Sequence, residues 1–152
     1  MILFSQGKTY FEGKVKFLNR LLRGNGMYMI LNRHVALIKP KQPFLDWLES
    51  QPDWDVDITL EEIRADRCAY LIPGYPLNDQ AMRYVERNHK SFFEWELYCW
   101  YTDKSIWPKK RTLSVFRKWF DVEIHTMTID MLEEYIDREE IEMEDLLEEE
   151  EL

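Results

Sequence analysis

The sequence has little glycine, with five residues in a chain of 152. A loop that wraps a phosphate with its backbone amides needs closely spaced glycines, and no such group is present. The Gly-x-Ser-x-Gly pattern, which holds a nucleophilic serine on a sharp turn, is absent as well. The sequence therefore offers no support for the common nucleotide-binding loops or for nucleophilic catalysis.

Cysteine is also rare, with Cys68 and Cys99 as its two representatives. Two cysteines are too few for a disulfide scaffold, and both lie in apolar segments, where a free cysteine behaves as a small hydrophobic residue. A single bridge between them is the alternative, but we expect reduced thiols and a cytoplasmic protein. With no CxxC and no HxxxH spacing we predict no metal site, and we expect no cofactor.

The sequence has no long hydrophobic run. The longest, at residues 27–31 and 35–38, have the length of strands, whereas a membrane-spanning helix needs about 20 apolar residues. Residues 2–4 form too short an apolar run for a secretory signal. We therefore expect no membrane partner.

Charge is distributed unevenly along the chain, whose net charge is -9. Residues 1–41 contain one acidic residue, Glu12, and residues 121–152 contain one basic residue, Arg138. An acidic protein repels nucleic acid at long range, which argues against a nucleic-acid partner. Alternatively, the basic N-terminal part and the acidic C-terminal part attract each other within the protein.

The pattern of apolar residues predicts the secondary structure. Apolar, β-branched segments predict strands at about 28–38, 67–73 and 121–131, with a bulge or break at Asn32-Arg33 in the first. Helical spacing and capping residues predict helices at about 43–51, 59–65, 78–102 and 112–120. This order predicts a single α/β or α+β domain with a small sheet of at least three strands covered by helices. We favour a mixed sheet over an all-parallel one.

Composition divides the chain into three parts. Residues 1–26 form a basic N-terminal extension whose membership of the folded unit is open, and residues 27–131 form the globular domain. Residues 132–152 form an acidic amphipathic tail with helical spacing. Because like charges gather at its end, we expect the tail to be disordered there.

Half of the aromatic residues lie between Tyr84 and Phe120. Aromatic side chains bury roughly 150–250 Å² each, so this stretch should form the core. The number of aromatics exceeds ordinary core needs, and exposed aromatic patches mark interfaces. We expect some of these at the surface: Trp54, Tyr75, Trp95, Tyr101 and Trp107.

Two polar residues fall on the apolar face of the helix at 78–102. His89 and Glu96 lie two turns apart, about 10 Å along the axis. A buried carboxylate needs a partner, and a histidine titrates near neutral pH. The pair is either a catalytic site, with His125 as a further candidate, or a structural pair in which Glu96 binds an arginine and His89 binds a backbone carbonyl.

The segment Lys104–Lys118 contains six basic residues and no acidic one. Cations beside aromatic residues form single-stranded nucleic-acid and phosphate sites. The candidate anion-binding residues are Lys104, Trp107, Lys109, Lys110 and Arg111. A contact between this segment and the acidic tail, within the chain or across a dimer, is the alternative.

We expect a non-catalytic protein-binding, adaptor or inhibitor-type module, with a protein partner or a homodimer. Two alternatives stay open. One is a small enzyme using Glu96 and His89, and the other is an RNA- or phosphate-binding module using Lys104–Lys118.

Overall fold

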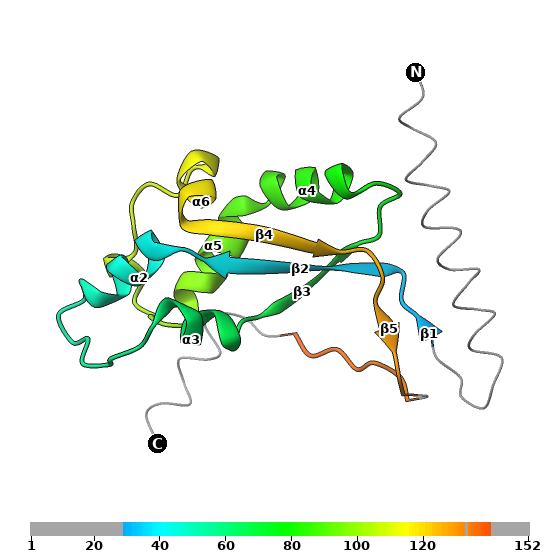
Figure 1. The fold of residues 1–152 in the computed structure, drawn as a ribbon, viewed down its shortest axis with the longest axis horizontal. Coiled ribbons are helices and arrows are strands. Elements are labelled where there is room, and N and C mark those ends of the chain that lie inside the picture. Colours follow the sequence, from blue (N-terminus) through cyan, green and yellow to red (C-terminus); the bar gives the residue numbers. More distant parts are fainter. Residues whose placement is uncertain (1–28, 133, 141–152) are drawn as a thin grey trace.

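The computed structural model describes residues 29–132 and 134–140. The predicted basic extension at 1–26 lies outside the described residues, as do residues 141–152 of the predicted tail. The described chain forms an α+β fold with two small sheets (Figure 1). The prediction of an α/β or α+β fold is confirmed, and the structure has the α+β form.

The larger sheet has three strands in the order β3-β2-β4. Its strands are β2 (Arg33–Pro40), β3 (Ala69–Pro73) and β4 (Phe120–His125). Both β3 and β4 pair antiparallel with β2, so the sheet is antiparallel rather than mixed. The second and third strands of the prediction do run parallel to each other, but β2 separates them, and the expectation of a mixed sheet was wrong.

A two-stranded ribbon continues this sheet beyond a break. β1 (Met29–Ile30) pairs antiparallel with β5 (Ile129–Asp130). The break in the first strand comes at Leu31 and Asn32, next to the predicted position. There the Arg33 guanidinium donates to the carbonyl and the side-chain oxygen of Asn32, and Leu31 N–H bonds Thr128. The two predicted long strands are thus each divided in two.

Two short helices precede the long helical region. In α2 (Gln42–Glu49), Pro43 stands in the first turn, where its missing N–H leaves no intrahelical bond unmade. In α3 (Leu60–Ala65), Thr59 is the N-cap, and its side chain and that of Glu62 bond each other's backbone N–H. Both helices match their predicted ranges closely.

The predicted helix at 78–102 consists of two helices, α4 (Asn78–Arg87) and α5 (His89–Tyr98). Asn88 separates them with φ −103° and ψ 15°. Its side-chain amide donates to the Tyr84 carbonyl at 2.8 Å, and the His89 ring bonds the Glu86 carbonyl at 2.7 Å. Side chains therefore bond the carbonyls at the end of α4, and the chain leaves the helical path there.

The helices lie on one side of the three-stranded sheet, and α5 passes behind the strands in Figure 1. A 3-10 turn, η1 (Lys104–Ile106), and α6 (Leu113–Trp119) complete the set. The core lies between this layer and the sheet, with Phe93 packing on Trp119 and Phe120 at centroid distances of 5.2 and 5.1 Å. Phe44 of α2 joins them, 5.3 Å from Phe120. The prediction that aromatics of 84–120 form the core is confirmed.

The described part of the tail forms no helix. Leu132 and residues 134–140 are irregular, and their hydrogen bonds within the described chain are local, from the Leu132 N–H to Asp130 and from the Arg138 N–H to Asp137. Two side chains of this segment, Tyr135 and Ile136, are exposed. The helix predicted from Leu132 is therefore wrong over these residues. A stripe of apolar residues stabilises a helix mainly when another element covers it, and nothing described does so here.

Candidate functional site

Glu96 is buried in the core, and one donor from the described chain bonds its carboxyl group. It lies on the sheet-facing side of α5 and is 5% exposed. The Tyr70 hydroxyl, from β3, donates to its Oε1 at 2.5 Å. The arginine partner expected for Glu96 is absent from the described residues: Arg64 bonds the Pro40 carbonyl, and Arg111 bonds Glu94.

Burial dominates the electrostatics of this contact. Loss of hydration raises the pKa of Glu96 to about 7, although the bond from Tyr70 acts in the opposite direction. Burial and the adjacent Glu96 together raise the pKa of Tyr70. Tyr70 therefore remains a hydroxyl donor, and Glu96 is the group of the pair that changes charge near neutral pH.

His89 does not contact Glu96. Its Nδ1 lies 2.7 Å from the Glu86 carbonyl, and since a carbonyl only accepts, Nδ1 carries the proton. Its ring packs on Phe116 at 6.1 Å. A pocket of about 320 Å³ is lined by residues of α4, α6 and β4, including Met82, Glu86 and Phe116, and by neither His89 nor Glu96. The two catalytic candidates thus have separate partners.

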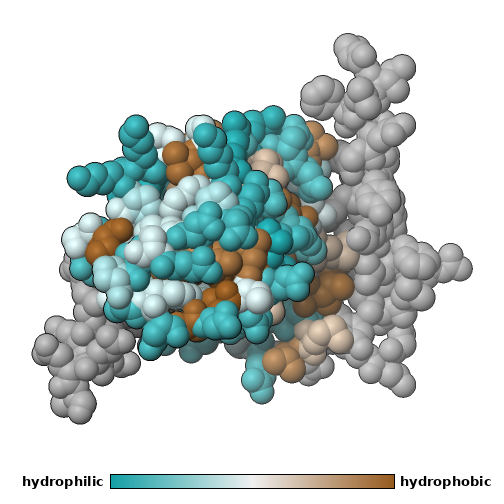
Figure 2. Space-filling view, turned by 60° about the vertical axis from the view of Figure 1, so that its left-hand side comes forward, coloured by the Kyte–Doolittle hydropathy of each residue, from teal (hydrophilic) through white to brown (hydrophobic). Residues whose placement is uncertain are grey.

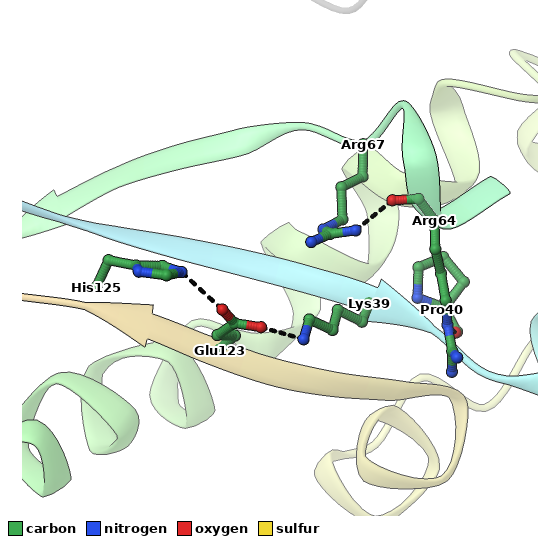
Figure 3. A network of polar contacts seen from close by, with 6 residues as sticks. All are labelled: Lys39, Pro40, Arg64, Arg67, Glu123 and His125. Carbon is green, nitrogen blue, oxygen red and sulfur yellow. Dashed lines mark hydrogen bonds and ion pairs between the residues drawn. The ribbon is translucent and has the colours of Figure 1, made fainter. Parts of the chain in front are cut away.

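His125 lies on the opposite side of the sheet. It is exposed at the end of β4, with Nε2 2.8 Å from Glu123, which also binds Lys39 of β2 (Figure 3). The same figure shows the Arg64 and Arg67 side chains near the end of β2, with Arg67 donating to the Arg64 carbonyl. The structure does not bring His125 together with His89 or Glu96.

The basic segment divides into bound and unbound residues. Arg111 bonds Glu94 and the Pro108 carbonyl and lies 5.9 Å from the Trp107 ring centre. Trp107 is buried, and its Nε1 donates to the Tyr101 carbonyl at 2.8 Å. Lys104, Lys109 and Lys110 are exposed. No described residue forms an ion pair with these three lysines, and that includes the described acids of the tail.

The aromatic residues predicted at the surface are mostly covered. Trp54, Tyr75, Trp95 and Tyr101 are half-buried, and Trp107 is buried. The large apolar residues that are exposed in the described chain are instead Met29, Val56, Leu71, Met131, Leu132, Tyr135 and Ile136. The side of the molecule drawn in Figure 2 is mainly hydrophilic, with apolar groups set between polar ones.

On one side of the three-stranded sheet the described chain places no helix, and we call this side the open face. On β2 the inward residues His34, Ala36, Ile38 and Pro40 are buried, and the alternate residues are half-buried. The open face comprises Arg33, Val35, Leu37, Lys39, Ala69, Leu71, Pro73, Asp121, Glu123 and His125. Its aliphatic members Val35, Leu37 and Leu71 take no part in the core cluster. Sequence reasoning missed this face, because a continuous apolar run like that of β2 is typical of a strand covered on both sides.

Cys68 and Cys99 are both free and exposed, rather than packed as small hydrophobic residues. Among residues 29–132 and 134–140 no three His, Cys, Asp or Glu side chains gather as metal ligands do. No helix in the same residues has the length and apolar character needed to cross a membrane.

Comparisons with known proteins add nothing to this description: no family model matches the chain, and neither curated proteins nor solved structures give a match. What can be said of function therefore depends on the geometry alone.

Proposed function

We propose that the protein is a non-catalytic protein-binding module, and that its binding surface is the open face together with the adjacent edge of β3. The observation that carries this proposal is Leu71, which is 52% exposed on β3. It lies opposite Val35 of β2, so aliphatic side chains of two strands are neighbours on a surface that water contacts.

The edge of β3 adds backbone hydrogen-bonding capacity to this surface. In the described chain β3 pairs with β2 alone, so its other edge has no strand beside it. An unpaired edge accepts an extended segment of another chain, and alternate side chains of that segment then lie on the sheet face. Pro73 ends this edge, since it has no N–H to donate.

The size of the face indicates what kind of partner it suits. Three strands of five, eight and six residues, about 4.8 Å apart, present roughly 300 Å². A stable contact between two globular surfaces buries about 800 Å² on each partner. The partner is therefore an extended segment of another protein with aliphatic residues at alternate positions.

The proposal is tested by selecting peptides from a displayed random library on the full chain and mapping the selected peptides by amide chemical shifts. We expect enriched peptides with aliphatic residues at alternate positions, and shifts concentrated on β3 and β2. Peptides that shift residues elsewhere, or no enrichment, would refute the proposal.

Two variants give a matched comparison. Leu71→Asp and Val56→Asp each place a carboxylate at an aliphatic residue that is half exposed, at 52% and 51%. Leu71→Asp should abolish peptide binding, and Val56→Asp, in the loop before α3, should retain it. Equal loss in both variants would contradict the assignment to the open face. If the chain is a dimer that Leu71→Asp dissociates, the open face binds a second copy instead.

A second candidate is anion binding through Lys104, Lys109 and Lys110, which are exposed with no partner among the described residues. Since this binding would depend on counterion release, affinity for a single-stranded oligonucleotide should fall steeply with salt. Absence of binding at low ionic strength removes this candidate.

A further inference from the structure

The contact between β3 and α5 pairs Tyr70 with Glu96 and places Cys68 near Cys99. Tyr70 bonds Glu96 and packs its ring edge-on against Phe92 at 5.1 Å. Residues two apart on a strand lie on the same side, and so do residues three or four apart on a helix. Cys68 precedes Tyr70 by two residues and Cys99 follows Glu96 by three. The geometry of the Tyr70–Glu96 pair therefore brings Cys68 opposite Cys99.

The two side chains are neighbours: the Cys68 thiol acts on Cys99 both through its charge and as a side-chain hydrogen-bonding group. Both residues are exposed and free, one immediately before β3 and the other at the C-terminal end of α5. Small reagents in solution can therefore reach two neighbouring thiols.

We propose that Cys68 and Cys99 are a modification site, at which thiol–disulfide exchange with a low-molecular-weight disulfide such as glutathione disulfide forms an intramolecular bridge. The Cys68 thiolate attacks one sulfur of the reagent, and a mixed disulfide forms as the first glutathione thiolate leaves. The Cys99 thiolate then attacks the Cys68 sulfur and releases the second. The two thiols lose two electrons and two protons in total, and glutathione disulfide becomes two glutathione thiols.

The order of the two steps follows from the surroundings of Cys99. Loss of hydration, with the adjacent Cys68 and Glu96, raises the pKa of Cys99 to about 12. Little Cys99 thiolate exists at neutral pH, so Cys99 is a slow first nucleophile. Its position beside Cys68 supplies the proximity that the second, intramolecular attack requires.

The bridge would join the start of β3 to the end of α5 across a loop of roughly 30 residues. Closing a loop of this length restricts the unfolded chain and stabilises the fold. We expect the oxidised protein to melt at least about 5 °C above the reduced one.

The test treats the full native chain with glutathione disulfide and follows intact mass. We expect a monomer that has lost two hydrogen atoms, a bridged peptide joining Cys68 to Cys99 on proteolysis, and a rise in melting temperature that dithiothreitol reverses. Stable glutathione adducts on the wild-type chain, or disulfide-linked dimers, would overturn the proposal, as would an unchanged melting temperature.

Single serine variants separate the two roles. Cys99→Ser should stop at one glutathione adduct on Cys68, formed as fast as the first step in wild type. Cys68→Ser should acquire an adduct on Cys99 much more slowly. Similar adduct rates in the two variants would overturn the proposed order, and a bridge that forms only in urea would overturn the site itself.

Discussion

The carboxyl group of Glu96 lies in the core with one donor, the Tyr70 hydroxyl, and its pKa is raised by burial from 4.5 to about 7. Between these values the unfolded chain has released the proton and the folded chain still holds it. Folding stability attributable to this group is therefore complete below pH 4.5, falls as pH rises towards 7, and is constant above that. The shift corresponds to roughly 3 kcal/mol.

Glu96→Gln should remove this pH dependence, because glutamine has the same shape and does not titrate. Between pH 4.5 and 8 the wild type should lose about 3 kcal/mol of unfolding free energy relative to Glu96→Gln. Urea denaturation at several pH values measures it. Glu61→Gln, an exposed position on α3, should follow the wild-type profile, and parallel profiles for all three proteins would refute the assignment.

Tyr70→Phe should leave the Glu96 carboxyl group buried without its donor. We expect a loss of about 1–3 kcal/mol, with the larger value above pH 7, where the acceptor is charged. The pKa of Glu96 should rise further, since the bond from Tyr70 lowers it. Denaturation and carboxyl-carbon NMR titration measure these effects.

Tyr135→Phe is the matched control for this change. Tyr135 is fully exposed and no hydrogen bond of its hydroxyl is present in the described chain, so its removal should change stability by less than about 0.5 kcal/mol. If Tyr70→Phe behaves in the same way, the hydroxyl does not stabilise Glu96.

Sequence reasoning identified Glu96 as a misplaced charge on an apolar helix face, since helix periodicity alone assigns a residue to a face. It did not identify Tyr70 as the partner, because the pairing joins β3 to α5 across 26 positions of chain. An arginine was the expected partner of a carboxylate. A carboxyl group whose pKa is about 7 needs only a neutral donor, and a tyrosine at a core edge supplies one.

At the scale of the element, local signals predicted helix starts well and interruptions poorly. The helices predicted to begin at about 59 and 112 do begin there, with Thr59 and Thr112 as the N-caps of α3 and α6. The interruption at Asn88 was missed, because the apolar spacing continues across it from Val85 to Phe92. An asparagine in a helix can bond a carbonyl of the preceding turn or face solvent. Which of the two Asn88 does depends on how α5 packs, and the local sequence does not encode that packing.

Thr59→Ala tests the cap of α3. The substitution removes the acceptor for the Glu62 N–H and one side of the capping box, and we expect a loss of about 1 kcal/mol. A shift of the urea midpoint with an unchanged slope measures it. Thr102→Ala, in the loop after α5, should have a negligible effect because no hydrogen bond of that side chain is present among the described residues. Equal midpoints for the two variants would mean that the cap is not stabilising.

At the scale of the molecule, sequence order predicted the layers but not the direction of the strands. Both β3 and β4 pair with β2, and the direction of β4 is set by how α4, α5 and α6 return the chain to the sheet. The number of helices between β3 and β4 does not determine the direction of β4, because the break at Asn88 adds a helix without reversing the chain. The open face was not predicted for a related reason. The same apolar run is compatible with a central strand that helices cover on both sides and with one that they cover on one side.

Every buried apolar residue of the described core lies between Ala36 and Phe120, so the folded unit should be contained in residues 27–131. A fragment with those limits should unfold in one cooperative urea transition, since it keeps both sheets and all six helical segments of the described chain. A fragment of residues 41–131 lacks β2, the strand between β3 and β4, and should show no such transition. A gradual transition for the longer fragment would mean that residues outside 27–131 are required to complete the core. Equal cooperativity in the two fragments would contradict the central position of β2.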